Sequence, residues 1–137
     1  MKSICHCSNI RFAARKLTEF YDRRLEIVGL TLPQFSLLRR LGREGEVNMN
    51  GLAKLAALDR TTLVRNLRPL LDAGLIKVAA DEMDARQKRV CLTARGRKKV
   101  SKAMPLWESA QASVEEILGP GRINLLDDLA EMLPALR

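Results

Sequence analysis

Apolar residues recur at spacings of three and four along most of the chain, which is the period of helices that bury one face. The first such stretch, residues 8–28, carries Ile10, Phe12, Ala13, Leu17, Phe20, Tyr21, Leu25 and Val28. Further stretches with this period cover residues 31–42, 49–57, 60–73 and 94–118, and a last one follows Gly121. The pattern therefore predicts a mainly α-helical protein.

Capping residues stand before four of these helices, where a side-chain oxygen accepts the first free backbone N–H groups. The expected N-caps are Thr31, Asn48, Asp59 and Thr93. Thr31 and Gln34 have the spacing of a capping box. Pro69 allows a break at Arg68 in the 60–73 stretch, but the apolar spacing continues across it and predicts one helix.

Two short stretches have the composition of strands, at residues 75–79 and 89–92, and Val47 fits a very short additional strand. The segment between the two, DEMDARQK, is polar except for Met83 and Ala85, which predicts a hairpin tip. The expected fold is a single α+β domain over residues 1–137, mainly α with a small β-hairpin.

Positive charge is concentrated in the middle of the chain, whose formal net charge is +8. Twelve basic and five acidic residues lie between Lys54 and Lys99, whereas residues 100–137 hold three basic and six acidic ones. Such a basic segment is either a solvated face or the footprint of a protein that binds nucleic-acid phosphates.

The helices at 49–57 and 60–73, followed by the hairpin, predict a winged helix-turn-helix. The second helix of this motif fits the DNA major groove, where its N-terminal residues reach base edges. The candidate base contacts are Arg60, Thr61, Thr62, Arg65 and Asn66. Arg68 and Lys88 are the expected phosphate contacts, and Arg86 at the hairpin tip suits a narrow minor groove.

Besides a protein that binds double-stranded DNA, three other classes of protein could be considered for this sequence. An ordinary α+β domain with exposed arginines, or a winged helix that binds protein, would share the helix pattern. The Asp59 cap, the arginine spacing and the polar hairpin favour DNA. An enzyme is not indicated, because the chain has no G-x-S-x-G, P-loop, H-E-x-x-H or dinucleotide motif and a single histidine, His6. We expect no cofactor.

The stretch from Leu52 to Gly96 resembles the MarR family of bacterial transcription regulators. The wing motif D-x-R-x-x-x-V-x-L-T-x-x-G stands here as Asp84, Arg86, Val90, Leu92, Thr93 and Gly96, and residues 29–41 are similar to the family's second helix. The resemblance implies a homodimeric regulator, most often a repressor, on a pseudo-palindromic operator. It implies dimerisation helices at about 1–30 and 100–137 and a DNA-binding lobe at about 31–99. The apolar terminal helices agree with a dimer, although packing within one chain would also use them.

Cys5-His6-Cys7 precedes the first predicted helix and leaves three interpretations open. The cysteines are inert surface or interface residues, a pair of thiols that senses oxidation, or ligands of a metal that bridges a dimer. In the second case a helix N-terminus favours the thiolate, and a second thiol traps its sulfenic acid as a disulfide. We expect no metal, because adjacent side chains point apart. Cys91, within a strand pattern, is expected to be structural.

The resemblance makes the oxidation hypothesis specific. Cys7 falls at the position of the reactive cysteine of hydroperoxide sensors in the family, and Tyr21 falls on one of its tyrosine partners. Arg11 and Leu32 stand where the other two tyrosines would be. Cys5 is the candidate resolving thiol.

A small-molecule inducer is the alternative signal. In MarR relatives a cleft between the dimer helices and the DNA-binding lobe binds small aromatic anions. Phe12, Arg15 and Phe35 are the candidate residues for such a cleft here. Trp107, on the long helix, is expected in the core or in an interface.

The chain has no apolar stretch near the 18 residues of a membrane span, and its first 16 residues lack the apolar region of a signal peptide. Its three cysteines, an odd number, do not form a disulfide framework. We therefore expect a cytoplasmic protein without a membrane partner.

Overall fold

Within residues 5–137, which the computed structural model describes, six α-helices and three strands follow the order that the apolar pattern predicts. The helices are α1 (His6–Leu25), α2 (Leu32–Glu44), α3 (Met49–Ala56), α4 (Arg60–Asp72), α5 (Ala94–Leu118) and α6 (Pro120–Met132). The strands are β1 (Val47–Asn48), β2 (Ile76–Ala80) and β3 (Lys88–Leu92). Short 3-10 turns, η1 (Glu26–Val28) and η2 (Leu133–Ala135), follow α1 and α6. The prediction of a mainly helical α+β protein is confirmed.

The predicted N-caps form the expected hydrogen bonds. Thr31 and Gln34 make both bonds of a capping box, and the side chain of Asn48 accepts from Gly51 N–H at 2.7 Å. Pro69 lies inside α4, which continues to Asp72 without a break. The predicted end of α2 near Gly42 was wrong: the helix runs to Glu44 and ends at Gly45, whose φ of 79° is a conformation that favours glycine.

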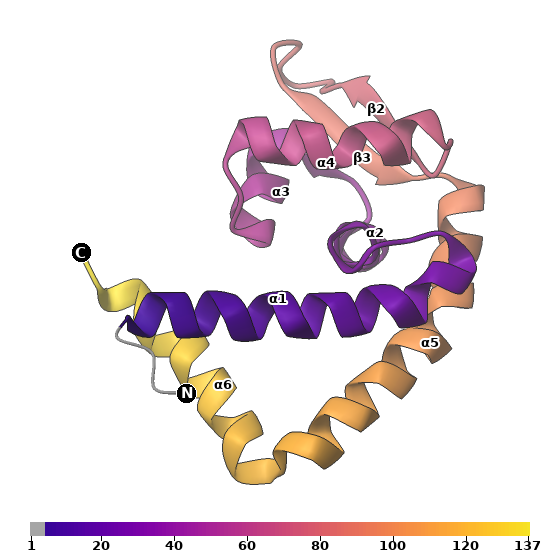
Figure 1. The fold of residues 1–137 in the computed structure, drawn as a ribbon. Helices are drawn as coiled ribbons and strands as arrows, with labels where there is room; N and C mark the ends of the chain where they lie inside the picture. The colour runs from indigo at the N-terminus through magenta and orange to yellow at the C-terminus, as the bar shows by residue number, and fades with distance from the viewer. Residues whose placement is uncertain (1–4) are drawn as a thin grey trace.

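The strands form one antiparallel sheet in the order β1-β3-β2. Val90, in the central strand, pairs with Val47 on one side and with Val78 on the other, and it is fully buried. The loop between β2 and β3 carries the polar tip that the sequence predicts. Figure 1 shows that this hairpin extends beyond α4, so its tip is free to meet a partner.

The main core lies in the lobe formed by α2, α3, α4 and the sheet, closed by residues 100–107 of α5. Its fully buried side chains include Leu38, Leu52, Leu63 and Val90. Leu55 has the spacing of a buried apolar residue in the predicted helix at 49–57, but it is 40% exposed, because Leu52 one turn earlier already fills the contact of the short helix α3 with the core.

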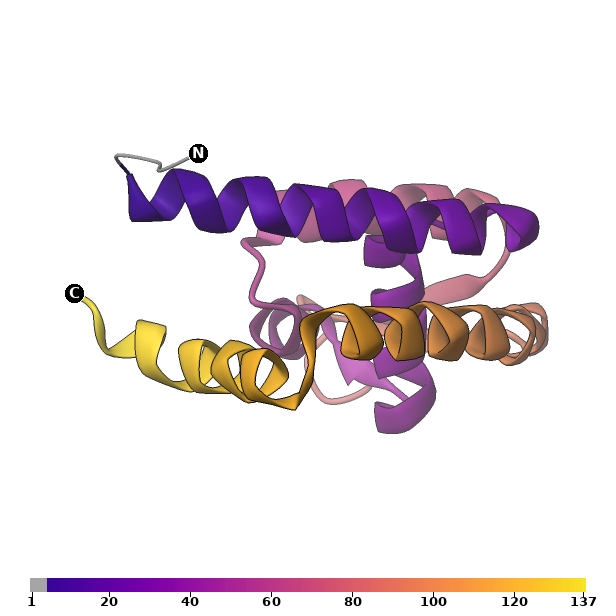
Figure 2. The ribbon, with the colours of Figure 1, turned by 60° about the horizontal axis from the view of Figure 1, so that its bottom comes forward.

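Helices α1, α5 and α6 extend away from this lobe (Figures 1 and 2). Tyr21 donates a hydrogen bond to Gln111, and Arg24 donates one to the Ser109 hydroxyl at 2.8 Å, which joins the second half of α1 to α5. A smaller core around Tyr21, Ala110 and Val114 fills this contact. The start of α1 and the end of α6 lie at the same end of the molecule, remote from the sheet.

The two arms of the molecule, α1 and the α5–α6 pair, leave apolar surface uncovered. In the described part of α1, every residue up to Lys16 is exposed, and α6 contains no buried residue. The large exposed apolar residues of these arms are Ile10, Phe12, Ile117, Leu125, Leu126, Met132, Leu133 and Leu136. Among residues 5–137 no helix is long and apolar enough to span a membrane.

Candidate nucleic-acid interface

Asp59 holds the start of α4. Its carboxylate accepts from the backbone N–H of Thr62 at 2.8 Å and from the Thr62 hydroxyl at 3.0 Å. These two hydrogen bonds keep the pKa of Asp59 below its usual value, so the cap stays ionised. The cap fixes where the first turn of α4 begins and therefore which side chains it exposes.

The two adjacent threonines have different environments. Thr61 is exposed, whereas Thr62 is half-buried and its hydroxyl already donates to Asp59. Of the two candidate base contacts, Thr61 has the exposed side chain, and the hydroxyl of Thr62 is occupied by the cap.

The remaining predicted residues of α4 lie opposite or beside its buried row, Leu63, Leu67 and Leu70. Arg60 and Arg65 are exposed. Arg68 is exposed and 3.5 Å from Asp72, an ion pair in solvent that contributes little to stability. Asn66 is half-buried, at the border between the exposed and buried sides of the helix.

The hairpin tip is ordered by its own aspartates. The Asp81 side chain accepts from Met83 N–H at 2.9 Å, and the Asp84 side chain accepts from Arg86 N–H at 3.0 Å. Backbone bonds join Asp81 to Gln87 and Gln87 to Asp84. The Arg86 side chain is 96% exposed, so the turn presents its guanidinium outward.

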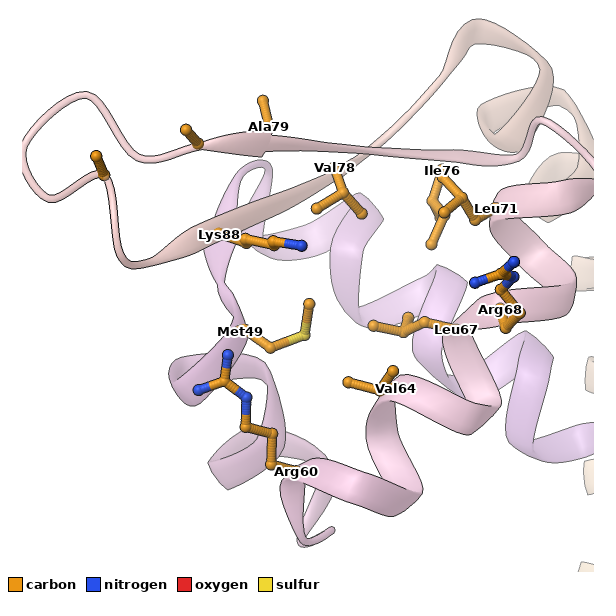
Figure 3. Close-up of a pocket in the computed structure, with 12 residues that line it drawn as sticks. Met49, Arg60, Val64, Leu67, Arg68, Leu71, Ile76, Val78, Ala79 and Lys88 are labelled. Atoms are coloured by element: carbon orange, nitrogen blue, oxygen red, sulfur yellow. The ribbon is translucent and has the colours of Figure 1, made fainter.

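A hollow of about 400 Å³ lies between α4, the start of α3 and the hairpin (Figure 3). Its lining is mostly apolar: Met49, Val64, Leu67, Leu71, Ile76, Val78, Ala79, Ala80 and Ala85. Three cations complete it, Arg60 and Arg68 from α4 and Lys88 from β3. The structure therefore brings three of the predicted DNA-contacting side chains around one depression.

Two further residues of α4 and the hairpin were not predicted from the sequence. Arg89, in β3, is half-buried, and its Nε atom has no hydrogen-bond partner among the described residues. Val64 is exposed in the middle of α4 although its apolar side chain belongs to no core. Of these two residues, only Val64 could have been found from the sequence, because it is an apolar residue outside the buried row of the helix.

Cys5 and Cys7 are both exposed, at the beginning of α1. Cys5 is the N-cap residue, with an extended backbone. The pKa of its thiol lies below the usual value, because the Ser8 hydroxyl and the backbone N–H groups of Ser8 and Cys7 hydrogen-bond to it. Local geometry thus favours the thiolate at Cys5, whereas the sequence pointed to Cys7.

Tyr21 is not brought to Cys7 within one chain. Fourteen residues of helix separate them, about 21 Å at 1.5 Å per residue. Tyr21 is buried against α5, and burial raises the pKa of its phenol, with Glu115 adding to the effect.

The three candidate cleft residues do not meet either. Phe12 and Arg15 lie on the exposed half of α1, whereas Phe35 is 1% exposed in the lobe core. The Phe35 ring lies 5.9 Å from that of Trp107, which packs against the main core as predicted, and the Arg39 guanidinium covers the indole at 4.2 Å. Phe35 is therefore a packing residue in this structure, since its ring is already enclosed by the core.

The family model described as "MarR family" matches residues 30–88, from just before α2 to the first residue of β3. The Mycobacterium tuberculosis transcriptional regulator MosR, solved in complex with DNA, is 41% identical and superposes with a TM-score of 0.86. That match covers 97% of this chain and 98% of MosR. The chain belongs to the MarR family.

Two further MarR-family comparisons bear on its role. The Mycobacterium bovis HTH-type transcriptional repressor Mb2911 is 34% identical over 90 residues, which are 66% of this chain and 65% of the relative. Bordetella bronchiseptica BpsR, whose DNA binding is regulated by 6-hydroxynicotinic acid, is 26% identical with a TM-score of 0.86, over 98% and 97% of the two chains. Members of the family are transcription regulators and not enzymes.

The MarR winged helix places its motif residues as the sequence predicts. Thr93 caps α5 by accepting from Gly96 N–H at 3.0 Å, and its hydroxyl donates to the Gly74 carbonyl at 2.6 Å. These bonds tie the end of the hairpin to the end of α4. Among residues 5–137, no group of three His, Cys, Asp or Glu side chains is placed to hold a metal.

Proposed function

We propose that this protein is a homodimeric cytoplasmic repressor that binds a pseudo-palindromic operator in double-stranded DNA. The observation that carries the proposal is the run of exposed cations from α4 to the hairpin, Arg60, Arg65, Arg68, Lys88 and Arg86, on a helix anchored by a buried leucine row. MosR, solved with DNA, and Mb2911, named a repressor, support this interpretation.

In this proposal α4 enters the major groove. Arg60, Thr61 and Arg65 contact base edges, and Asn66 reaches an adenine from the border of the helix. Arg68 and Lys88 contact phosphates on the strand that passes between helix and hairpin. Arg86, held outward by the Asp84 turn, enters the neighbouring minor groove.

The direct test is a fluorescence-anisotropy titration with the intergenic DNA upstream of the protein's own gene and with a random duplex of equal length. We expect tighter binding to the intergenic duplex. The logarithm of its affinity should fall linearly with the logarithm of salt concentration, with a slope of about −0.9 for each phosphate contact. Equal affinity for the two duplexes would overturn the proposal.

Base and phosphate contacts should respond differently to mutation. Arg65→Ala is expected to weaken operator binding about 5- to 150-fold and random-DNA binding much less, because a bidentate base contact is lost. Lys88→Ala should weaken both by a similar factor and reduce the salt slope by about 1. Titrations of both variants on both duplexes check the assignment, and equal losses on the two duplexes for Arg65→Ala would contradict it.

The exposed apolar surface of the first half of α1 and of α6 supports the dimer. A soluble monomer seldom leaves so many large apolar side chains in water along two adjacent arms. The start of α1 and the end of α6 lie at one end of the molecule, remote from the hairpin (Figures 1 and 2), so a dimer formed there would leave both DNA-binding faces open. A two-fold dimer matches an operator with two half-sites.

For the signal we propose oxidation of the thiols at Cys5 and Cys7. The thiolate attacks the terminal oxygen of a hydroperoxide and becomes a sulfenic acid, while the O–O bond breaks and the other oxygen leaves as an alkoxide, which takes a proton from water. The second thiol then displaces the oxygen, forming a disulfide and releasing water. The exposure of both sulfurs and the lowered pKa of Cys5 support this route.

Stoichiometric organic hydroperoxide is expected to release wild-type protein from operator DNA, with recovery after dithiothreitol. Cys5→Ser and Cys7→Ser should both prevent disulfide formation, and Cys91→Ser should respond as the wild type does. Anisotropy and intact-mass measurements follow the two events. If peroxide leaves DNA binding unchanged, the signal is a ligand instead, and 6-hydroxynicotinic acid, which regulates the similar BpsR, is the first compound to titrate.

A further inference from the structure

Val64 lies in the middle of α4 and is 48% exposed. Arg60 precedes it by one turn and Arg68 follows it by one turn, so the three share one side of the helix. Figure 3 shows the Val64 side chain directed into the hollow between α4 and the hairpin. The helix is anchored by other residues, Leu63 and Leu67, which are buried in the core.

An apolar side chain between two arginines has no evident purpose in the free protein. It exposes apolar surface to water, and a surface that bound only phosphates would need none. In the major groove the C5-methyl of thymine is the apolar group that a base edge presents. Val64 immediately precedes Arg65, a proposed contact to a base edge, so both belong to the turns of α4 that enter the groove in the proposed function.

We propose that Val64 packs against the C5-methyl group of one thymine in each operator half-site and so selects a T·A pair beside the base that Arg65 contacts. This rests on the proposed function, because it requires α4 in the major groove. The flanking cations Arg60 and Arg68 contact the DNA on either side. The apolar lining of the hollow, including Leu67, excludes water from the methyl contact.

The test uses the full-length protein and a duplex recovered by selection from random-sequence DNA. Each thymine of one half-site is replaced in turn by deoxyuridine, which removes the methyl group and keeps the base pairing. Wild-type protein is expected to bind one of these duplexes about fourfold more weakly, the factor for one buried carbon group, and the others unchanged.

Val64→Ala should bind the thymine duplex about fourfold more weakly than the wild type does. The variant should bind the deoxyuridine duplex as tightly as it binds the thymine duplex. Val64→Thr keeps the branched shape and one γ-methyl, so it should retain part of the discrimination. Leu55→Ala is the matched control, because Leu55 is an exposed apolar residue of α3 that does not line the hollow and should leave the discrimination intact. Thermal unfolding of each variant checks that it is folded.

The proposal is overturned if wild-type protein is indifferent to deoxyuridine at every thymine, or if Val64→Ala discriminates as strongly as the wild type. These outcomes leave the proposed function standing, since binding to the selected duplex is measured in the same titrations. Recovery of no selective duplex at all would overturn the proposed function itself, and this inference with it.

Discussion

Replacing Leu125 with aspartate is expected to convert the protein to a monomer and to lower its affinity for operator DNA by at least about a hundredfold. Leu125 is an exposed apolar residue of α6, a helix with no buried residue in the chain itself. In the proposed dimer its side chain is buried, and an unpaired carboxylate there would be strongly unfavourable. A monomer binds one half-site, so it loses the gain of about 10²–10⁴ from two linked sites.

Sedimentation velocity gives the oligomeric state, and anisotropy gives the affinity for the operator. Ile27→Asp is the matched control, because Ile27 is 81% exposed on η1, at the other end of α1 from the proposed dimer contact. It should stay dimeric and bind DNA normally. A dimeric Leu125→Asp variant would place the dimer contact elsewhere on the molecule, and a monomeric one with unchanged operator affinity would show that the dimer is not required.

Replacing Gly96 with alanine is expected to lower the free energy of unfolding by about 3 kcal/mol or more, the upper end of the range for overpacking. A Cβ atom on Gly96 would lie 2.0 Å from the Leu75 carbonyl oxygen and 3.2 Å from the Leu92 side chain. The obstacle is backbone, and the same carbonyl accepts from Thr93 N–H at 3.1 Å. The start of α5 would have to move off the end of the hairpin and break the bonds that hold it.

Chemical denaturation measures the loss, and the midpoint of thermal unfolding should fall by about 10 °C. Gly42→Ala is the control, because Gly42 lies inside α2 and its Cβ would meet only the Leu92 side chain at 3.5 Å, an ordinary contact. Alanine in a helix is favoured over glycine by about 0.8–1 kcal/mol, so this variant should be at least as stable as the wild type. Equal stability of the Gly96 and Gly42 variants would contradict the close approach.

The helices and their beginnings were predictable because both depend on neighbours in sequence. An N-cap such as Asp59 or Thr93 bonds to a backbone group three residues away, and an apolar row such as Leu63, Leu67 and Leu70 repeats within one helix. Predictions failed where the burial of a side chain depended on contacts between residues far apart in the sequence. Leu55 has the right period for burial, but the short helix α3 brings only Leu52 and its neighbours to the core.

The candidate DNA-contacting residues were predictable by type and order but not by environment. Nothing in the sequence distinguishes Thr61 from Thr62, whereas the structure shows that the Asp59 cap occupies the hydroxyl of Thr62. Likewise the sequence places two cysteines at the start of a helix, but only the structure shows the hydrogen bonds that favour the thiolate of Cys5. The grouping of Arg60, Arg68 and Lys88 around one hollow joins segments twenty residues apart and needed the tertiary structure.

The sequence by itself determined a mainly helical chain with a basic winged helix-turn-helix and its membership of the MarR family, because helix period, capping and the wing motif are local patterns. The tertiary structure alone decided that Phe35 is buried beside Trp107, that Tyr21 faces α5, and that Val64 is exposed between two arginines. The physical reason is the same in each case. Burial depends on which distant segment covers a side chain, and the spacing of apolar residues within one helix does not identify that segment.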